Sequence, residues 1–407
     1  MPPIDTKRRE AEIATRVRDL PALPAVLQKL IVVLNDMGSS TRDIQDIIST
    51  DPALTAKILR LANSPLYKGA HGAATISQAV TRLGFWKLRD VAISVGATET
   101  LAGLADPRVQ ERFWSHAIYT ATCAHVLTQH SGTSCSEETF VVGLLHDIGE
   151  LVLAAIMPEE YAEYRNYDPE YRLGSEEHVF GVTHARVGNM LLRQWDLPKT
   201  LCEAVRLHHN EIVIRSKREP VITVVAAADL LSRLHGVGGE APCPPSLLFT
   251  LFKRMKIEVS QVGAILEAVD KRVIETQEHL EITGDLSIIP PAGKPMNHKV
   301  AVISSDDTLV TWYRQLLSYG GHLFQAPKPF LDDPDAVDLV ILDLQTLGET
   351  RLQRLRPVLE AARHKTVALV PDPDGSAPLL TDWDLPKIDL FPSGDRITQT
   401  VVAAKRG

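Results

Sequence analysis

The sequence predicts two domains of different class: an all-α domain followed by an α/β domain with a doubly wound parallel sheet. Residues 14–280 carry helix caps, helix stops and apolar positions at helical spacing almost throughout. From residue 299 onward the pattern changes to short runs of Val, Ile and Leu, each followed by acidic or turn residues. Between the two patterns, residues 285–298 contain three prolines and a glycine, which predicts a stiff, exposed linker.

These observations place the domain limits. We expect the all-helical domain at residues 14–284, including a trailing helix near 258–280, the linker at 285–298 and the α/β domain at 299–407.

Capping signals mark the first helices of the N-terminal domain. Ser40 with Asp43 forms a capping-box pattern at the start of an apolar helical repeat. Asp51 followed by Pro52 predicts the N-cap and first turn of the next helix. Gly84 predicts a helix stop immediately before a further helix. The segment therefore reads as short helical hairpins in series.

Four apolar runs predict the strands of the C-terminal domain. They lie at 299–307, 336–344, 365–373 and 387–391. Helical stretches such as "TLVTWYRQLLSYG" separate them. Alternation of this kind is typical of a parallel sheet covered by helices.

Composition excludes several classes of function. The chain has 407 residues, a formal net charge of -8 and an estimated pI of about 6.0, so it lacks the basic footprint of a nucleic-acid-binding protein. Its charged N-terminus does not resemble a signal peptide, and Asp229 interrupts the apolar stretch "VITVVAAADLLSRL" before it could span a bilayer. The four cysteines include no C-x-x-C pair, which fits a reducing compartment. We therefore expect a cytoplasmic protein without a membrane partner.

Histidines and aspartates in apolar helical surroundings are the candidate functional residues. They are His116, His146, Asp147, His184, His208 and Asp229. An ionised carboxylate such as Asp229 costs several kcal/mol in apolar surroundings unless it is paired or coordinated. A divalent ion of iron, manganese or zinc, held by ligands from several helices, would explain the set. A dry hydrogen-bond network between histidines and aspartates would explain it as well.

The order of these residues resembles the HD superfamily of metal-dependent phosphohydrolases. His116, the pair His146 and Asp147, and then Asp229 match its ligand order, and His184 and His208 stand where dinuclear members add histidines. More closely, residues 14–280 are similar to the HDOD (HD-related output domain) family, through "LPALPAVLQKL", "DPALTAKILRLANSPLY", "GLLHDIGEL", "THARVGNMLLRQWDLP" and "HHN". The resemblance implies an all-helical bacterial domain, fused to signalling modules and regulatory rather than catalytic.

Two functions follow from this resemblance. The first is a signal-transduction output or scaffold protein that binds a protein partner or a small regulatory ligand, as a monomer or a homodimer. The second is a metal-dependent phosphohydrolase acting on a nucleotide or cyclic dinucleotide. Against the cyclic-dinucleotide phosphodiesterases of the superfamily, Glu150 replaces a lysine, Asn210 replaces a glutamate and Gly-Tyr-Pro is missing. A negative Glu150 near the site is expected to repel phosphate, so we favour the first function.

The C-terminal domain resembles a response-regulator receiver. Asp343 stands at the phosphoacceptor position, and Asp306 with Asp307 stands where an acidic pair would hold magnesium. Pro371 and Phe391, however, stand where a receiver carries its hydroxyl residue and its lysine. Without these groups we expect a docking or dimerisation surface rather than a phosphorylation switch.

Overall fold

The computed structural model describes most of the chain. The described residues are 6–36, 38–64, 72–131, 138–166, 172–214, 219–234, 237, 245–280, 298–319, 322–343, 347, 349–362, 366–370 and 387–389. Internal contacts divide the protein into two compact units. The helical unit comprises Met1–Ser232, Val237–Gly239 and Val269–Leu286, and the α/β unit comprises Arg233–Gly236, Glu240–Ala268 and Ser287–Gly407.

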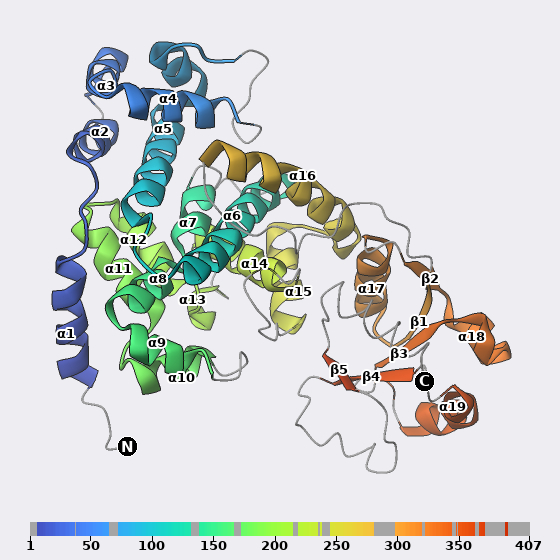
Figure 1. The fold of residues 1–407 in the computed structure, drawn as a ribbon. Helices are drawn as coiled ribbons and strands as arrows, with labels where there is room; N and C mark the ends of the chain where they lie inside the picture. The colour runs from blue at the N-terminus through green and yellow to red at the C-terminus, as the bar shows by residue number, and fades with distance from the viewer. Residues whose placement is uncertain are drawn as a thin grey trace. The chain divides into compact units, whose positions relative to one another are not determined.

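Helices of 4 to 26 residues build the helical unit (Figure 1). They are α1 (Thr6–Arg18), α2 (Ala25–Asn35), α3 (Thr41–Ile48), α4 (Pro52–Ala62), α5 (Ile76–Leu101), α6 (Pro107–His130), α7 (Thr139–Leu145), α8 (Ile148–Ile156), α9 (Pro158–Tyr164), α10 (Arg172–Val179), α11 (His184–Gln194), α12 (Lys199–Leu207), α13 (Glu211–Ile214) and α14 (Pro220–Leu234). The second part of α16 (Val262–Leu280) also belongs to this unit. The all-helical class predicted for this region is therefore confirmed.

The predicted capping signals operate as expected. The Ser40 hydroxyl accepts the backbone N–H of Asp43, whose carboxylate in turn accepts the backbone N–H of Ser40. Asp51 caps α4 through the N–H of Leu54, with Pro52 in the first turn. At Gly84 the backbone has φ 77°, outside the helical range, and this kink interrupts α5 where a helix stop was predicted.

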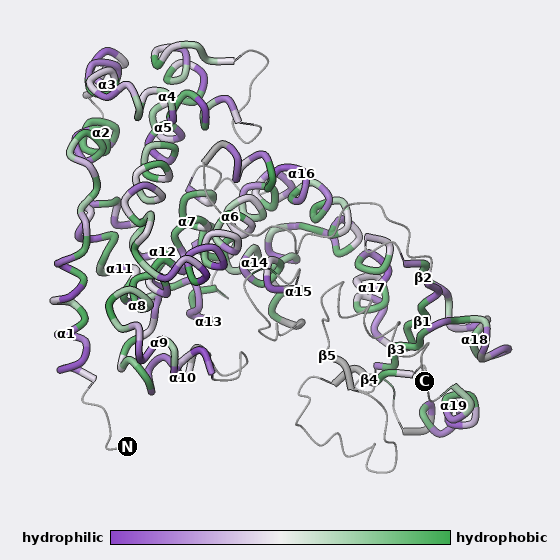
Figure 2. The backbone as a smooth tube through the Cα atoms, in the orientation of Figure 1, coloured by the Kyte–Doolittle hydropathy of each residue, from purple (hydrophilic) through white to green (hydrophobic). Residues whose placement is uncertain are grey.

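One long apolar segment of the helical unit is buried in its core. Thr139–Ile156 is long and apolar enough to cross a membrane by composition, but 83% of this window is buried within the protein. It is not one continuous helix, because α7 ends and α8 begins at His146 and Asp147. Figure 2 shows α7 and α8 as predominantly hydrophobic. The pair is accounted for as core helices, which pass the same composition test.

Among the described residues, the α/β unit contains a five-stranded parallel sheet. Its strands are β1 (Lys299–Ile303), β2 (Leu323–Gln325), β3 (Leu339–Asp343), β4 (Thr366–Val370) and β5 (Lys387–Asp389), in the order β2-β1-β3-β4-β5. This order belongs to the doubly wound α/β class. The four predicted strands are present. The sequence missed β2, a three-residue edge strand whose residues are exposed or half-buried and so lack an apolar run.

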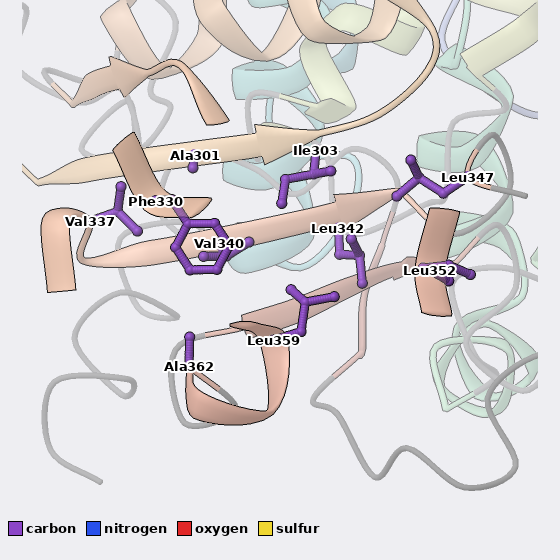
Figure 3. Close-up of a cluster of buried hydrophobic side chains, with 10 residues drawn as sticks. All are labelled: Ala301, Ile303, Phe330, Val337, Val340, Leu342, Leu347, Leu352, Leu359 and Ala362. Atoms are coloured by element: carbon purple, nitrogen blue, oxygen red, sulfur yellow. The ribbon is translucent and has the colours of Figure 1, made fainter. Parts of the chain in front are cut away.

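Helical segments accompany the sheet in this unit. They are α15 (Pro245–Met255), η2 (Val259–Gln261), the first part of α16, α17 (Asp307–Tyr319), α18 (Pro327–Asp332), η3 (Pro334–Ala336) and α19 (Glu349–Ala361). A cluster including Phe330, Val340 and Leu342 fills one side of the sheet (Figure 3). Trp312 on α17 packs against Phe249 and Phe252 on α15, with ring centroids 5.8 and 6.2 Å apart.

The division into units differs from the predicted domain limits. Residues 240–268 group with the α/β unit, whereas the sequence placed them in the domain at 14–284. The predicted linker at 285–298 lies outside the described residues except for His298. The limits of the independently folding domains therefore stay a prediction, as does the receiver-like identity of residues 299–407.

Candidate metal centre

Two glycines bring together the helices that carry the candidate residues. A Cβ atom on Gly143 in α7 would lie 2.8 Å from the Cα of Ala121 in α6. A Cβ atom on Gly149 in α8 would lie 1.9 Å from the carbonyl oxygen of His184 in α11. Real side chains do not tolerate such distances, so only glycine allows the backbones to approach this closely. The first contact sets α7 beside the helix of His116, and the second sets α8 beside His184.

The first group of candidate ligands is His116, His146, Asp147 and Asp229. All four side chains are buried. The Nε2 atoms of His116 and His146 lie 3.2 Å apart. Asp229 Oδ1 lies 3.2 and 3.6 Å from these two nitrogens, and Asp147 Oδ2 lies 3.4 and 3.3 Å from them. Two imidazoles and two carboxylates from α6, α14 and the junction between α7 and α8 therefore face a common point.

The second group shares Asp147 and adds His184, His208 and His209. Asp147 Oδ1 lies 3.0 Å from His184 Nε2 and 3.1 Å from His208 Nε2. These two nitrogens are 3.4 Å apart. The His208 and His209 rings lie side by side, with centroids 3.9 Å apart. The two oxygens of Asp147 thus face different groups, so this carboxylate connects them.

In four of these histidines, the Nδ1 atom lies within hydrogen-bonding distance of an acceptor outside the two ligand groups. Their Nδ1 atoms lie 3.1 Å from Val237 O for His116, 2.8 Å from Gly143 O for His146, 2.6 Å from Val205 O for His208 and 2.6 Å from Glu176 Oε1 for His184. A carbonyl or carboxylate oxygen only accepts, so each Nδ1 carries the hydrogen. In the neutral ring the Nε2 lone pair then points into the cluster. Lone pairs only 3.2–3.4 Å apart require a cation or a shared proton between them.

The electrostatics of the cluster favour positive charge. Burial alone would lower the pKa of His146, but the charges of Asp147 and Asp229 outweigh it and raise that pKa to about 10. Burial also opposes charging of His184, where Glu176 and Asp147 raise the pKa well above its usual value. Burial would raise the pKa of Asp147, yet the neighbouring histidines hold it well below its usual range. Asp147 thus stays ionised and attracts protons or a metal cation.

The donor set fits a divalent metal. Imidazole nitrogens with carboxylate oxygens suit zinc, iron and manganese. A histidine that binds a metal through Nε2 usually donates its Nδ1–H to a hydrogen-bond acceptor, as these histidines do. His116, His146 and Asp229 would hold one ion, and His184 and His208 a second, with Asp147 between them. The buried cluster can therefore hold a metal ion, and its donor set suits each of these three metals.

Two contributors were not among the predicted site residues. His209 joins the second group, and burial next to His208 and His184 lowers its pKa well below the usual value, so the ring is neutral and able to bind a metal. Glu176 orients His184, accepting its Nδ1–H and its backbone N–H, the latter at 2.8 Å. The doublet "HHN" signalled His209, whereas Glu176 lies on α10 in a polar stretch that carries no signal of its own.

One wall beside the cluster carries a salt bridge. A cavity of about 10 Å³ next to His116 is lined by Arg112, Glu150 and Tyr161, among others. Glu150 Oε1 accepts from the Tyr161 hydroxyl at 2.7 Å and from Arg112 Nη2 at 3.2 Å. The expectation that Glu150 presents a repelling negative charge is therefore corrected, because the guanidinium of Arg112 offsets that charge.

The acidic residues of the α/β unit are arranged differently. Asp343 at the end of β3 is buried and accepts the hydroxyl of Ser304 at 2.6 Å. Asp306 caps α17 by accepting the backbone N–H of Thr308 and Leu309, and Asp307 occupies the first turn of α17. Within the described part of the chain, these three carboxylates do not form a group with converging ligand atoms. The expected docking or dimerisation role of this unit stays a prediction, and Pro371 and Phe391 lie outside the described residues.

Comparison with known proteins identifies the helical region. The HDOD domain family matches residues 20–211. An uncharacterised protein of Treponema pallidum (strain Nichols) is 31% identical over 252 residues, which cover 60% of this chain and 48% of that protein. The chain thus spans about half the length of this curated relative.

Solved structures share the fold. An HDOD domain protein of unknown function from Geobacter sulfurreducens is 24% identical with a TM-score of 0.52, covering 67% of this chain and 98% of that one. A Shewanella amazonensis SB2B protein provisionally named a phosphohydrolase gives 24% and 0.52, covering 66% and 97%. A Marinobacter aquaeolei VT8 protein provisionally named a signal transduction protein gives 20% and 0.55, covering 68% and 65%. The chain therefore contains an HDOD domain, at residues 20–211.

Proposed function

We propose that this chain is a signal-transduction output protein whose HDOD domain binds a protein partner or a small regulatory ligand. In this proposal the His/Asp cluster holds divalent metal as a fixed centre of the domain, and the α/β unit modulates the contact with the partner. A bound ion supplies positive charge between the Nε2 atoms and fixes α6, α8, α11, α12 and α14 to one another.

The observation that carries this proposal is the enclosure of the cluster. His146 and His208 are 0% and 1% exposed, and Asp147 and Asp229 are each 3% exposed. The cavity beside His116 measures about 10 Å³, which is room for a single water molecule. Sites for small-molecule ligands usually enclose about 300–1,000 Å³. A nucleotide therefore does not fit into the cavity beside His116 in this structure. This enclosure favours a structural role for the metal centre.

The first test of the proposal is metal content. Untagged full-length protein, purified without chelator, is analysed by mass spectrometry beside Asp147→Ala and the matched control Asp46→Ala, which changes an exposed aspartate on α3. We expect bound iron, manganese or zinc in the wild type and the control, and loss of it in Asp147→Ala. A wild type that contains no metal and takes up none on dialysis would favour the dry hydrogen-bond network.

The second test addresses hydrolysis. Wild-type protein with Mn²⁺, Fe²⁺ or Zn²⁺ is offered bis(p-nitrophenyl) phosphate and a panel of cyclic dinucleotides. We expect no turnover above the protein-free rate. Turnover that disappears in folded Asp147→Ala but persists in Asp46→Ala would instead establish an enzyme.

The second candidate function is a metal-dependent phosphohydrolase, favoured by one specific observation. The ligand set is complete in type and divided into two groups that share Asp147, an arrangement suited to two neighbouring ions. Such ions act as Lewis acids and activate water. Arg112 offsets the charge of Glu150, which weakens the electrostatic objection to a phosphate substrate. The hydrolysis test above separates this candidate from the first.

A further inference from the structure

Three polar side chains meet on the wall next to His116. Arg112 lies one turn before His116 on α6, Glu150 lies in the first turn of α8 after Asp147, and Tyr161 belongs to α9. They line the same small cavity as His116. The approach to the cluster is therefore bordered by one cation, one carboxylate and one hydroxyl.

The hydrogen bonds converge on a single oxygen. The Tyr161 hydroxyl donates to Glu150 Oε1 at 2.7 Å, and Arg112 Nη2 donates to the same atom at 3.2 Å. Arg112 Nη2 also lies 3.4 Å from the Tyr161 oxygen. A guanidinium and a hydroxyl aimed at one oxygen are the donors that bind a phosphoryl or carboxylate group. Glu150 occupies their shared acceptor position.

Solvent reaches this position. The side chains of Arg112 and Glu150 are 31% and 24% exposed, in contrast to the enclosed cluster beside them. A half-buried ion pair that solvent reaches contributes little to stability, because water screens it. The Glu150 side chain can therefore leave its donors without a large structural cost, and an external oxyanion can then reach them.

We propose that Arg112 and Tyr161 form an oxyanion subsite next to His116, and that Glu150 fills it as an internal competitor. A ligand with a phosphoryl or carboxylate group binds when it displaces the Glu150 carboxylate. The inference rests on the proposed function, because it names the class of the small regulatory ligand and places it beside the proposed metal centre. The local concentration of a tethered carboxylate is high, so the wild type binds simple anions weakly.

The test measures anion binding by full-length protein as purified. Isothermal titration with inorganic phosphate, and separately with acetate, compares wild type, Glu150→Ala, Glu150→Gln and the double variant Glu150→Ala with Arg112→Gln. We expect at least tenfold tighter binding of one anion in Glu150→Ala, a smaller gain in Glu150→Gln, and return to the wild-type level in the double variant. The preferred anion tells a phosphoryl ligand from a carboxylate ligand.

Each outcome decides the proposal. A gain that depends on Arg112 supports it. No gain in either folded single variant, or a gain that persists in the double variant, overturns it. Glu150→Gln keeps the shape and the Tyr161 hydrogen bond, so it carries the test should Glu150→Ala fail to fold. Metal content is measured on the same samples. Glu150 lies outside both ligand groups, so its substitution is not expected to remove a metal ligand. Failure of the metal centre would then be seen independently of anion affinity.

Discussion

Buried carboxylates in the two units are satisfied in different ways. In the helical unit, Asp147 faces the Nε2 atoms of His184 and His208. The Nδ1 atoms of the same rings donate hydrogen bonds to other acceptors. In the α/β unit, Asp343 at the end of β3 accepts a hydrogen bond from the hydroxyl of Ser304, which directly follows the neighbouring strand β1. The first arrangement brings several lone pairs together and needs a cation or a shared proton between them, whereas Asp343 belongs to no group of converging ligand atoms among the described residues. Burial of a carboxylate alone therefore does not indicate a metal site.

The comparison predicts unequal costs for removing each carboxylate. Asp147→Ala leaves several buried imidazoles without their counter-charge, and we expect the helical unit to lose about 3–5 kcal/mol of unfolding free energy. Asp343→Ala leaves one hydroxyl without its acceptor, and we expect the α/β unit to lose about 1–3 kcal/mol. Urea denaturation followed by hydrogen exchange and mass spectrometry reports on each unit separately. Equal losses would remove the distinction between the two arrangements.

Glu176 offers a smaller and more selective perturbation. Glu176→Gln keeps the side-chain size but weakens the hold on the Nδ1–H and backbone N–H of His184. Loss of such a supporting group typically lowers metal affinity about 10–100-fold. Competition with a chromogenic chelator measures the change, and Glu177→Gln, at an exposed position on the same helix, is the matched control. Equal affinities in the two variants would show that the orientation of His184 does not matter for binding.

Ser304 tests the hydrogen bond to Asp343 in the α/β unit. Ser304→Ala removes the hydroxyl that donates to Asp343 and accepts the backbone N–H of Asp306. We expect a loss of about 1–2 kcal/mol in the stability of this unit and no change in metal content. Ser318→Ala, at an exposed position on α17, is the control and should be nearly neutral. A change in metal content would contradict the separation of the two sites.

Sequence reasoning succeeded where the physical signal is local. Ser40 and Asp51 cap helices through bonds within a few residues, and Gly84 breaks a helix by its own backbone. Apolar runs likewise predicted β1, β3, β4 and β5. Strand β2 escaped because an edge strand of three residues buries too little to leave an apolar run.

The candidate site was only partly predictable. An aspartate such as Asp229 in an apolar stretch requires a partner, and that requirement drew attention to the cluster. The resemblance already placed His184 and His208 at the positions of a second ion, but the sharing of Asp147 by both groups depends on close helix packing at Gly143 and Gly149, which has no signature in a single sequence. The same holds for Glu176, since its role depends on α10 packing beside the start of α11.

Two histidines on α6, His116 and His125, have neighbours of opposite charge. Carboxylates surround His116 and raise its pKa against the effect of burial. For His125, burial together with the positive charges of Arg272 and Lys87 lowers the pKa to about 4, and the Gln129 side chain bonds its Nε2 at 2.9 Å. Below pH 6.5 the unfolded chain binds a proton at His125 that the folded protein does not bind until about pH 4. Stability contributed by neutral His125 is therefore present above pH 6.5 and falls as the pH drops through that window.

We expect His125→Gln to remove this part of the acid sensitivity. Between pH 7 and about pH 5.5, the wild type should lose on the order of 1 kcal/mol more stability than the variant, because one pKa unit corresponds to about 1.4 kcal/mol and partial exposure reduces the effect. Urea unfolding at both pH values measures the difference. His130→Gln, near the end of the same helix, is the control and should keep the wild-type pH dependence. If the pH dependence of stability decreases equally in both variants, the acid sensitivity does not arise from His125. The contrast between the cationic and acidic surroundings of the two histidines on α6 would then have no measurable effect on the stability of the fold.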